Sequence, residues 1–395
     1  MNPWRGLAGL PRASFLIALA TFINRAGVMV RPFLVLYLVQ RLGFEEARAG
    51  WVLSLYGATT LVAAPLSGWL SDRFGPRRVL RTSLVAAALA VACYPLARSF
   101  TAVVAATVLF SLCNEMPRPA LMTLVAEVAP DPLRKQAFVL SRLAINFGLS
   151  IGPALGGFLA EIDFLWIFWV DAAASLIAAL VLLRTPLPAA VRHERPHGSA
   201  LRVLARDGAL LCFFAATVLN AVMFFQHDST MAYYMTHHLG LRKFDYGLTI
   251  TVNTLLIVLI EVELNTRLSH WSHRKSLVVG SLLTTAGFGS MAFAHTWWTI
   301  VGAVVIWTFG EMIAMPAMSA LINDLAPANR RGLYMGTLTL AFGAGLTIGP
   351  KFGMTLLDRG GPHLLWSVVA AVGLLSTLLY RLLPARRPAE LPAPQ

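Results

Sequence analysis

Ionisable side chains stand inside long apolar segments of this chain, where a charge needs a partner, an aqueous cavity or a chemical task. A charge at the centre of a membrane span costs at least about 2.5 to 3.5 kcal/mol on the insertion scale. Glu311 lies in the middle of such a segment and has no basic neighbour on its own helix face. Since desolvation favours the protonated form of a carboxyl group, Glu311 is the first candidate for a proton carrier. The alternative is a static ion pair with Arg25 or Arg31.

Other embedded polar residues extend this set. Glu115 and Arg118 share one helix face, so an internal ion pair and a proton or cation site are both open interpretations. His227 stands beside Asp228 near the end of a segment. The pair can relay protons, or it can be part of a helix end that is exposed to water. Glu311, Glu115, Asp228 and His227 are therefore the proton-coupling candidates. The candidates to line a substrate cavity are Asn24, Arg25, Arg31, Asn114, Arg118, Asn220, Gln226, Tyr233 and Trp307.

Apolar segments long enough to cross a bilayer must position these residues. Hydrophobic residues make up 57% of the 395-residue chain and charged residues 13%, a composition typical of a surface that faces hydrocarbon. Segments near the ~20 residues that a bilayer requires are predicted at about 13–38, 48–70, 78–97, 101–127, 137–160, 163–184, 208–236, 246–266, 276–294, 297–323, 333–357 and 363–383. We therefore expect an all-α membrane protein with twelve transmembrane helices in two pseudo-symmetric six-helix halves.

The second half of the chain repeats the first at an offset of 197 residues. Gly148-Leu-Ser-Ile-Gly152-Pro153 is echoed by Gly345-Leu-Thr-Ile-Gly349-Pro350. Duplication of this kind is typical of transporters built from two related halves. We divide the chain into an N-terminal half at 1–184, a cytoplasmic linker at 185–206 and a C-terminal half with a short cytoplasmic tail at 207–395.

The distribution of Lys and Arg predicts the orientation in the membrane. Twenty-one of them lie in the N-terminus and alternate loops, and six lie in the opposite loops. Because cytoplasmic loops carry the excess of basic residues, both termini are expected in the cytoplasm. Compact loops favour a bacterial inner membrane. The basic residues are dispersed at helix ends, so the net charge of +13 indicates lipid headgroups rather than nucleic acid as the partner.

A charged segment between the second and third predicted helices carries a family resemblance. Its sequence Gly68-Trp-Leu-Ser-Asp72-Arg73-Phe-Gly75-Pro-Arg77-Arg78 resembles the G-x-L-a-D-R-x-G-R-[KR] signature of the major facilitator superfamily. Glycine allows close helix approach and a tight turn, and an aspartate can pair with an arginine. We expect a latch on the cytoplasmic face formed by Gly68, Asp72, Arg73, Gly75, Arg77 and Arg78. Positive-inside anchoring alone is the alternative for the arginines.

The fifth predicted helix carries a second motif, formed by Gly148, Gly152, Pro153, Gly156 and Gly157. It is similar to the motif that marks drug:proton antiporters within that superfamily. Its glycines present a smooth face for close helix packing, and its proline introduces a kink. The resemblance implies a role in the opening of the two halves. A simple packing seam is the alternative interpretation.

The resemblance implies secondary transport by alternating access through a cavity lined by the first helix of each three-helix unit. We expect proton-coupled efflux of small amphipathic or hydrophobic compounds, by a protein that acts as a monomer. The alternative is proton-coupled import of peptides or other small organic solutes, because Thr21-Phe-Ile-Asn24-Arg25 resembles part of the peptide-transporter pattern. In that pattern two glutamates stand where this sequence has Thr21 and Asn24.

A non-transporting membrane receptor or enzyme is a minor alternative. The sequence contains no nucleotide-binding loop, no paired metal ligands and no nucleophile constellation. Cys93, Cys113 and Cys212 all fall inside predicted spans and imply neither a disulfide framework nor a thiol metal site. No enzymatic activity, cofactor or metal is therefore expected.

Overall fold

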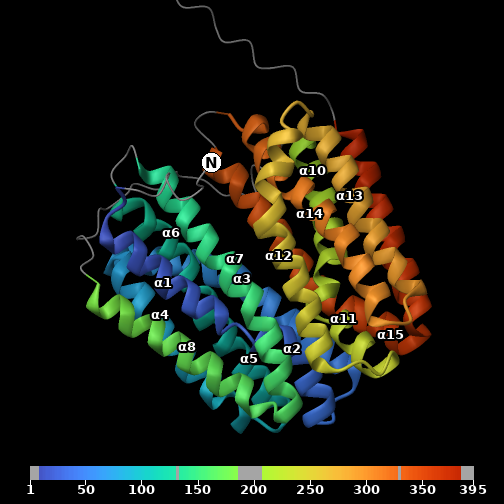
Figure 1. Cartoon of the computed structure of the whole chain (residues 1–395), viewed down its shortest axis with the longest axis horizontal. Coiled ribbons are helices and arrows are strands. Elements are labelled where there is room, and N and C mark those ends of the chain that lie inside the picture. Colours follow the sequence, from blue (N-terminus) through green and yellow to red (C-terminus); the bar gives the residue numbers. More distant parts are fainter. Residues whose placement is uncertain (1–8, 130–132, 186–206, 328–330, 384–395) are drawn as a thin grey trace, which may run out of the picture.

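The regular structure of this chain is helical throughout the residues that the computed structural model describes, which are 9–129, 133–185, 207–327 and 331–383. Figure 1 shows the helices as long rods in two groups. The expected all-α membrane fold is confirmed. The predicted linker lies almost wholly at 186–206, outside the described residues, so the division of the chain into domains stays a prediction.

The spans of the first half are single helices or pairs of helices separated by a short break. Their elements are α1 (Arg12–Ala26), α2 (Val30–Leu36) and η2 (Tyr37–Arg41); α3 (Glu46–Phe74); α4 (Pro76–Cys93) and η3 (Tyr94–Leu96); α5 (Phe100–Glu115) and α6 (Pro117–Val128); α7 (Arg134–Ile162); and α8 (Leu165–Arg184).

The second half repeats this order. Its elements are α10 (Gly208–Phe224), η5 (Phe225–Asp228), α11 (Thr230–Tyr233) and η6 (Tyr234–His238); α12 (Lys243–Arg267); α13 (His273–Ser290) and η7 (Met291–Phe293); α14 (Trp297–Leu325); and α15 (Arg331–Leu382).

The last element accounts for the difference between eleven continuous spans in the described residues and the twelve predicted helices. α15 contains 52 residues, and a straight helix of that length would extend about 78 Å. The hydrocarbon core of a bilayer is only about 30 Å thick. Gly361 interrupts the helix with φ 69° and ψ −171°, so α15 forms two spans that reverse direction there.

The first and seventh spans are both interrupted, and each interruption is stabilised by a buried polar side chain. Between α1 and α2, the carboxylate of Asp171 from α8 accepts hydrogen bonds from the backbone N–H groups of Met29 and Val30, both at 3.3 Å. In the seventh span, the Gln226 side chain donates to the carbonyl groups of Val222 and Gly349. Asp171 pairs backbone N–H groups that the break in the first span leaves without partners, and Gln226 links the break in the seventh span to α15, so both spans can bend inside the protein.

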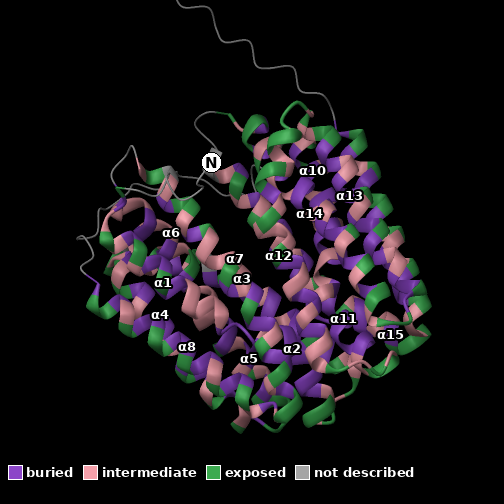
Figure 2. Ribbon diagram, viewed as in Figure 1, coloured by how far each residue is buried: buried purple, intermediate pink, exposed green. Residues whose placement is uncertain are grey.

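Buried side chains distinguish the two ends of the molecule. One large core cluster combines residues of both halves around α2, η2, α11 and η6, and α2 lies against α11 there (Figure 2). We call this the closed end. At the other end the halves have separate cores, one drawn from residues 10–182 and one from 210–383. We call this the basic end, because α3, α8 and α12 finish there at or beside Arg73, Arg184 and Arg267.

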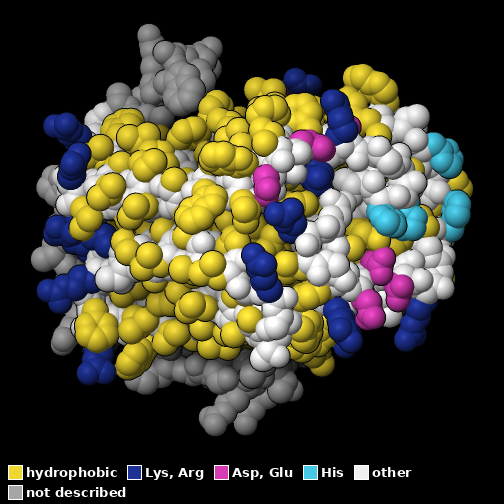
Figure 3. Space-filling view, turned by 90° about the horizontal axis from the view of Figure 1, so that it is seen from below, with side chains coloured by type: hydrophobic (Ala, Val, Ile, Leu, Met, Phe, Trp, Pro, Cys, Tyr) yellow, Lys and Arg dark blue, Asp and Glu magenta, His cyan; other side chains and the backbone are white. Residues whose placement is uncertain are grey.

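The outer surface suits a lipid environment. Large apolar side chains are exposed along α4, α7 and α8, among them Leu89, Phe158, Trp166 and Trp169. In Figure 3 hydrophobic side chains cover most of the visible face; Lys and Arg lie along one edge and also among the Asp and Glu side chains towards the other edge, where His lies. Soluble monomers rarely expose apolar patches of more than a few hundred Å², so this belt is the surface that contacts hydrocarbon.

Two glycine contacts hold the halves together, and they repeat each other. A β-carbon at Gly247 of α12 would lie 2.1 Å from the carbonyl oxygen of Pro153 in α7, and one at Gly50 of α3 would lie 2.9 Å from that of Pro350 in α15. Both glycines and both prolines stand 197 residues apart. The sequence repeat is therefore also a repeat of the packing between the halves.

Candidate functional site

A polar cluster in the first half is organised by Tyr56 of α3, a residue that the sequence did not single out. Its fully buried hydroxyl donates to Glu115 Oε1 at 3.0 Å and accepts from Asn114 Nδ2 at 2.8 Å. Both partners lie at the end of α5, just before Pro117 starts α6. Among the described residues Arg118 forms no ion pair with Glu115, so the interpretation of these two as an internal ion pair is wrong. Glu115 ends α5 and Arg118 follows Pro117 in α6, so a helix break separates them.

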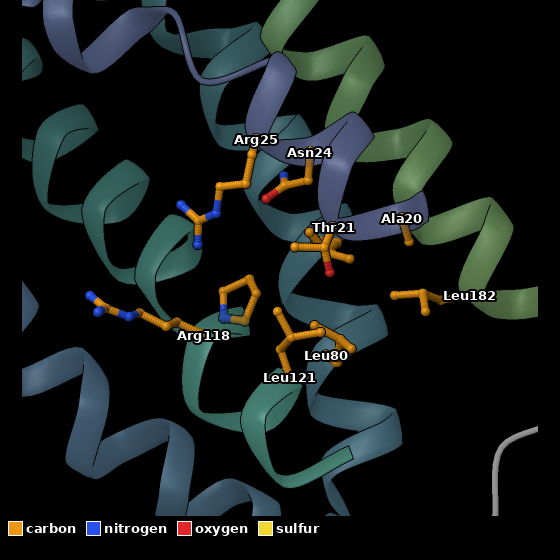
Figure 4. Close-up of a pocket in the computed structure, with 10 residues that line it drawn as sticks. Ala20, Thr21, Asn24, Arg25, Leu80, Arg118, Leu121 and Leu182 are labelled. Atoms are coloured by element: carbon orange, nitrogen blue, oxygen red, sulfur yellow. The ribbon is translucent and has the colours of Figure 1, made fainter. Parts of the chain in front are cut away.

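Two arginines of the first half lie near this cluster without an acidic ion-pair partner among the described residues. Figure 4 shows the side chains of Arg25 and Arg118 extending to the same side, away from the apolar residues Leu80, Leu121 and Leu182. Arg25 is half-buried and its Nε has no hydrogen-bond partner, whereas Arg118 is exposed. Arg25 also experiences the charges of Glu115, Arg118 and Arg31. The resulting local charge is positive.

In the second half, Glu311 of α14 occupies the equivalent polar position. Its Oε2 accepts a hydrogen bond from Asn253 Nδ2 of α12 at 3.0 Å, and the same amide lies 3.0 Å from Thr308 Oγ1. No cationic group pairs with Glu311 within the part of the chain that the structure describes. The alternative of a static ion pair with Arg25 or Arg31 is therefore wrong.

The positions of these two polar clusters follow the repeat. Glu311 stands 197 residues after Asn114, and Asn253 stands 197 residues after Tyr56. The sequence analysis missed Tyr56 and Asn253. Applying the same offset to every embedded polar residue would have found both, because duplicated halves place equivalent residues at equivalent depths.

Arg31 joins the two halves through Asp228. Arg31 Nη2 lies 3.2 Å from Asp228 Oδ2, and the Asp228 side chain is only 3% exposed. His227 Nε2 lies 3.2 Å from the other carboxylate oxygen, Oδ1. Arg31 and Asp228 also stand 197 residues apart, so the ion pair lies on the pseudo-twofold axis that relates the halves. The breaks in the first and seventh spans bring the two side chains together.

Further polar contacts join the two halves. Tyr233 donates its hydroxyl proton to Glu46 Oε1 at 2.6 Å, and Gln40 Nε2 lies 3.4 Å from Thr236 Oγ1. Towards the basic end, Arg142 of α7 pairs with Glu261 of α12. Sequence reasoning did not pair Arg142 with Glu261, because their partnership depends on which faces of α7 and α12 meet.

Several predicted cavity residues are buried within helix packing in this conformation. Asn220 donates to Ser281 Oγ at 3.3 Å, Gln226 stabilises the helix break described above, and Trp307 packs against Phe288 with 4.7 Å between ring centroids. Tyr233 is 1% exposed and belongs to the closed end. Asn24 donates to Ser175 Oγ at 3.2 Å and lines the pocket of Figure 4. Among the described residues, no group of three or more His, Cys, Asp or Glu is arranged to hold a metal ion.

The combination of duplicated helical halves, a shared closed end and embedded charges agrees with one family. The family profile described as Major Facilitator Superfamily matches residues 15–260 and 213–395. This chain belongs to the Major Facilitator Superfamily. It is therefore an integral membrane transporter and not an enzyme. The resemblance to this superfamily that the sequence showed is confirmed.

Relatives within the superfamily cover nearly the whole chain. The uncharacterized MFS-type transporter YttB of Bacillus subtilis is 26% identical over 94% of this chain and 96% of its own length. Multidrug resistance protein MdtH of Aeromonas hydrophila is 26% identical over 93% and 92%. A Na⁺, Li⁺, K⁺/H⁺ antiporter of Planococcus maritimus is 24% identical over 83% and 85%.

Solved structures support the same fold. A POT family transporter in complex with 5-aminolevulinic acid superposes with a TM-score of 0.80 over 95% of this chain and 97% of that chain. Its sequence is only 16% identical, so the likeness concerns the fold alone.

The superfamily signature lies at the turn between α3 and α4. Gly75 adopts φ 85° and ψ 143°, ends α3 and donates its N–H to the Ser71 carbonyl at 2.8 Å. A positive φ favours glycine, which explains the residue type at this turn. The Arg73 guanidinium lies over the rings of Trp69 and Phe74. The side chain of Asp72 lies outside the described part of the structure, and the latch formed by Gly68, Asp72, Arg73, Gly75, Arg77 and Arg78 stays a prediction.

The glycine motif of α7 packs against both halves. Added β-carbons would lie 2.8 Å from the Phe22 carbonyl oxygen at Gly148 and 3.0 Å from that of Ala26 at Gly152. The same atom at Gly157 would lie 2.6 Å from the Lys243 carbonyl oxygen of α12. The motif thus lets α7 approach the first span of its own half and the eighth span of the other half. A role in opening remains a prediction for these residues.

Proposed function

We propose that this transporter couples the movement of a small organic substrate to protons by alternating access, with Glu311 as a proton carrier. One observation carries the proposal: the Glu311 carboxylate accepts from Asn253 and has no cationic partner among the described residues. Without a cation, a carboxyl group inside a membrane span is stabilised by binding a proton. A site that binds a proton when enclosed and releases it when wetted can couple proton flow to conformation.

Orientation follows from the basic residues. The positive-inside rule supports a cytoplasmic location for the basic end and both termini. The conformation described here is then closed to the outside and divided on the cytoplasmic side. Bacterial relatives support the inner membrane as its location. Because one chain carries both halves and all the embedded charges, we propose that a monomer is sufficient for transport.

Export of amphipathic compounds is the direction that the relatives favour. One is called a multidrug resistance protein and another a cation/H⁺ antiporter. Proton antiport lets an inward proton gradient drive a compound outwards.

Import of an acid-bearing solute is the second candidate, and a specific observation favours it. Arg25 and Arg118 extend to the same side without acidic ion-pair partners among the described residues (Figure 4). Guanidinium groups bind carboxylates and phosphates with strong, directional hydrogen bonds. A substrate carboxylate would neutralise these arginines, whereas a lipophilic cation would be repelled by them.

A flux experiment tests the proposal and separates the two candidates. The protein is reconstituted in liposomes that contain a pH-sensitive dye, and a proton gradient is imposed. Lipophilic cations, lipophilic carboxylates and short peptides are then added one class at a time. We expect substrate-evoked proton flux that Glu311→Gln abolishes. The matched control is Glu263→Gln, which changes an exposed carboxylate paired with Arg267 at 2.8 Å.

The possible outcomes separate clearly. Flux that disappears in Glu311→Gln and persists in Glu263→Gln supports the assigned carrier. Flux evoked by lipophilic cations favours the exporter, and flux evoked by carboxylates or peptides favours the importer of acid-bearing solutes. Substrate transport that is unchanged in Glu311→Gln would remove Glu311 from the coupling mechanism.

A further inference from the structure

His227 has two hydrogen-bonding neighbours that together determine where its protons are. Its Nδ1 lies 2.7 Å from the carbonyl oxygen of Phe224, and its Nε2 lies 3.2 Å from Asp228 Oδ1. A carbonyl oxygen accepts hydrogen bonds and donates none. Nδ1 must therefore carry a hydrogen.

The second ring nitrogen then faces a carboxylate. In neutral imidazole only one nitrogen carries a hydrogen, so a neutral His227 would direct the lone pair of Nε2 at Asp228 Oδ1. That contact is attractive only if a proton lies between the two atoms. Asp228 also pairs with the guanidinium of Arg31 through Oδ2 at 3.2 Å, which favours its ionised form. The geometry therefore fits His227 as an imidazolium.

The other groups around His227 do not remove the need for a proton on Nε2. Its backbone carbonyl accepts from the Tyr246 hydroxyl of α12 at 2.9 Å, and its ring packs against Phe224 and Trp307. Glu311 of α14 is near enough to interact electrostatically with His227, but in the protonated form proposed above it carries no charge that could replace the contact with Asp228. α15 meets η5 at Gly353, which approaches Gln226, and the nearby Lys351 of α15 has an exposed side chain.

We propose that His227 is a second proton-binding site of this transporter, and that its proton keeps the closed end closed. The inference rests on the proposed function, since it assigns one protonation event to one gate of the alternating-access cycle. In the closed state Asp228 bridges two cations, Arg31 from the first half and His227 from its own half. The bridge is formed at the contact between α2 and η5 and lies within the core that the halves share.

Loss of the proton weakens this contact in a defined way. A neutral His227 presents a lone pair to Asp228 Oδ1, and the nearly inaccessible carboxylate then has one cationic partner instead of two. Opening the closed end admits water, which solvates Asp228 and removes the repulsion. Protonation therefore favours the closed end as described here, and deprotonation favours opening. One proton changes the ratio of the two states by at most about tenfold per pH unit.

The opening can be measured by distance without any substrate. Arg98 and His295 are exposed, stand 197 residues apart and lie in equivalent loops of the two halves at the closed end. Both are replaced by cysteine for spin labelling after Cys93, Cys113 and Cys212 are replaced by alanine. Double electron–electron resonance then records the distance between the labels in lipid nanodiscs from about pH 5 to about pH 9, the range in which histidines titrate.

We expect a short distance at low pH and a growing long-distance population as the pH rises. His227→Gln, which cannot titrate, should abolish the dependence on pH. The matched control is His237→Gln at the same end, where the exposed ring stacks on Tyr233, and it should retain the wild-type dependence. Asp228→Asn should increase the long-distance population at every pH, because it removes the anion that both cations share.

Two results would overturn the inference. One is a wild-type distance distribution that does not change with pH, and the other is a pH-dependent change that persists in His227→Gln. Monodisperse elution and unchanged helicity by circular dichroism establish that each variant folds. Because the measurement needs no substrate, failure here leaves the flux test of Glu311 unaffected, and failure of that flux test leaves the gate measurement interpretable.

Discussion

A single methyl group at Gly247 should prevent the closed end from forming fully. Gly247 of α12 faces the carbonyl oxygen of Pro153 in α7, and the β-carbon of alanine would lie 2.1 Å from that oxygen. Carbon and oxygen atoms that are not bonded approach only to about 3.3 Å. The two helices must therefore separate by about 1 Å at this point, and neither backbone can rotate out of the way as a side chain would.

The size of this effect on the equilibrium depends on which conformations contain the contact between Gly247 and Pro153. Overpacking of this kind costs about 1–3 kcal/mol, and here the cost applies to the state in which α7 and α12 touch at the closed end. The gain in helix propensity from glycine to alanine, about 0.5–1 kcal/mol, is the same in both states and cancels. Gly247→Ala should therefore shift the population away from the closed end by about 5- to 150-fold.

The spin-label pair at Arg98 and His295 measures this shift at a fixed low pH. Gly302→Ala is the matched control, because Gly302 lies inside α14 and a β-carbon there meets nothing within 4 Å. If Gly247→Ala and Gly302→Ala give the same distance distribution, the close contact between α7 and α12 does not limit closure, and the reasoning from this glycine is refuted.

Two further predictions concern contacts on the first span. Gly148→Ala should lower the stability in detergent by about 1–3 kcal/mol, because the added carbon would lie 2.6 Å from Arg25 Cβ and 2.8 Å from the Phe22 carbonyl oxygen within one half; thermal unfolding measures the loss, and Gly302→Ala should not reproduce it. Arg31→Asp should abolish transport because it breaks the buried ion pair, which costs about 3–5 kcal/mol, and leaves two carboxylates facing each other. Adding Asp228→Arg should recover part of the transport, because it reverses the ion pair with residue 31 but loses the contact between Asp228 and His227. A double variant no more active than Arg31→Asp alone would count against the ion pair as a gate.

The sequence by itself determined the class of protein and most of its organisation. Hydropathy is a local property, so the spans could be placed from segment length alone. The repeat at 197 residues was visible because equivalent glycines and prolines meet the same packing requirement in both halves. The glycine spacing at 68–78 carried the family resemblance. Gly75 is part of that spacing because few residue types other than glycine adopt φ 85°, the angle found at this turn.

Only the tertiary structure decided which charges meet. Glu311 accepts a hydrogen bond from Asn253 and does not pair with an arginine, and Arg31 pairs with Asp228 rather than with Glu311. These partnerships depend on the rotation of each helix about its axis and on the breaks in the first and seventh spans. A side chain's direction changes by about 100° with each residue of a helix, so a break of a few residues redirects every polar group beyond it. Hydropathy does not record that rotation, and the packing of α2 against η5 and α11 determines it.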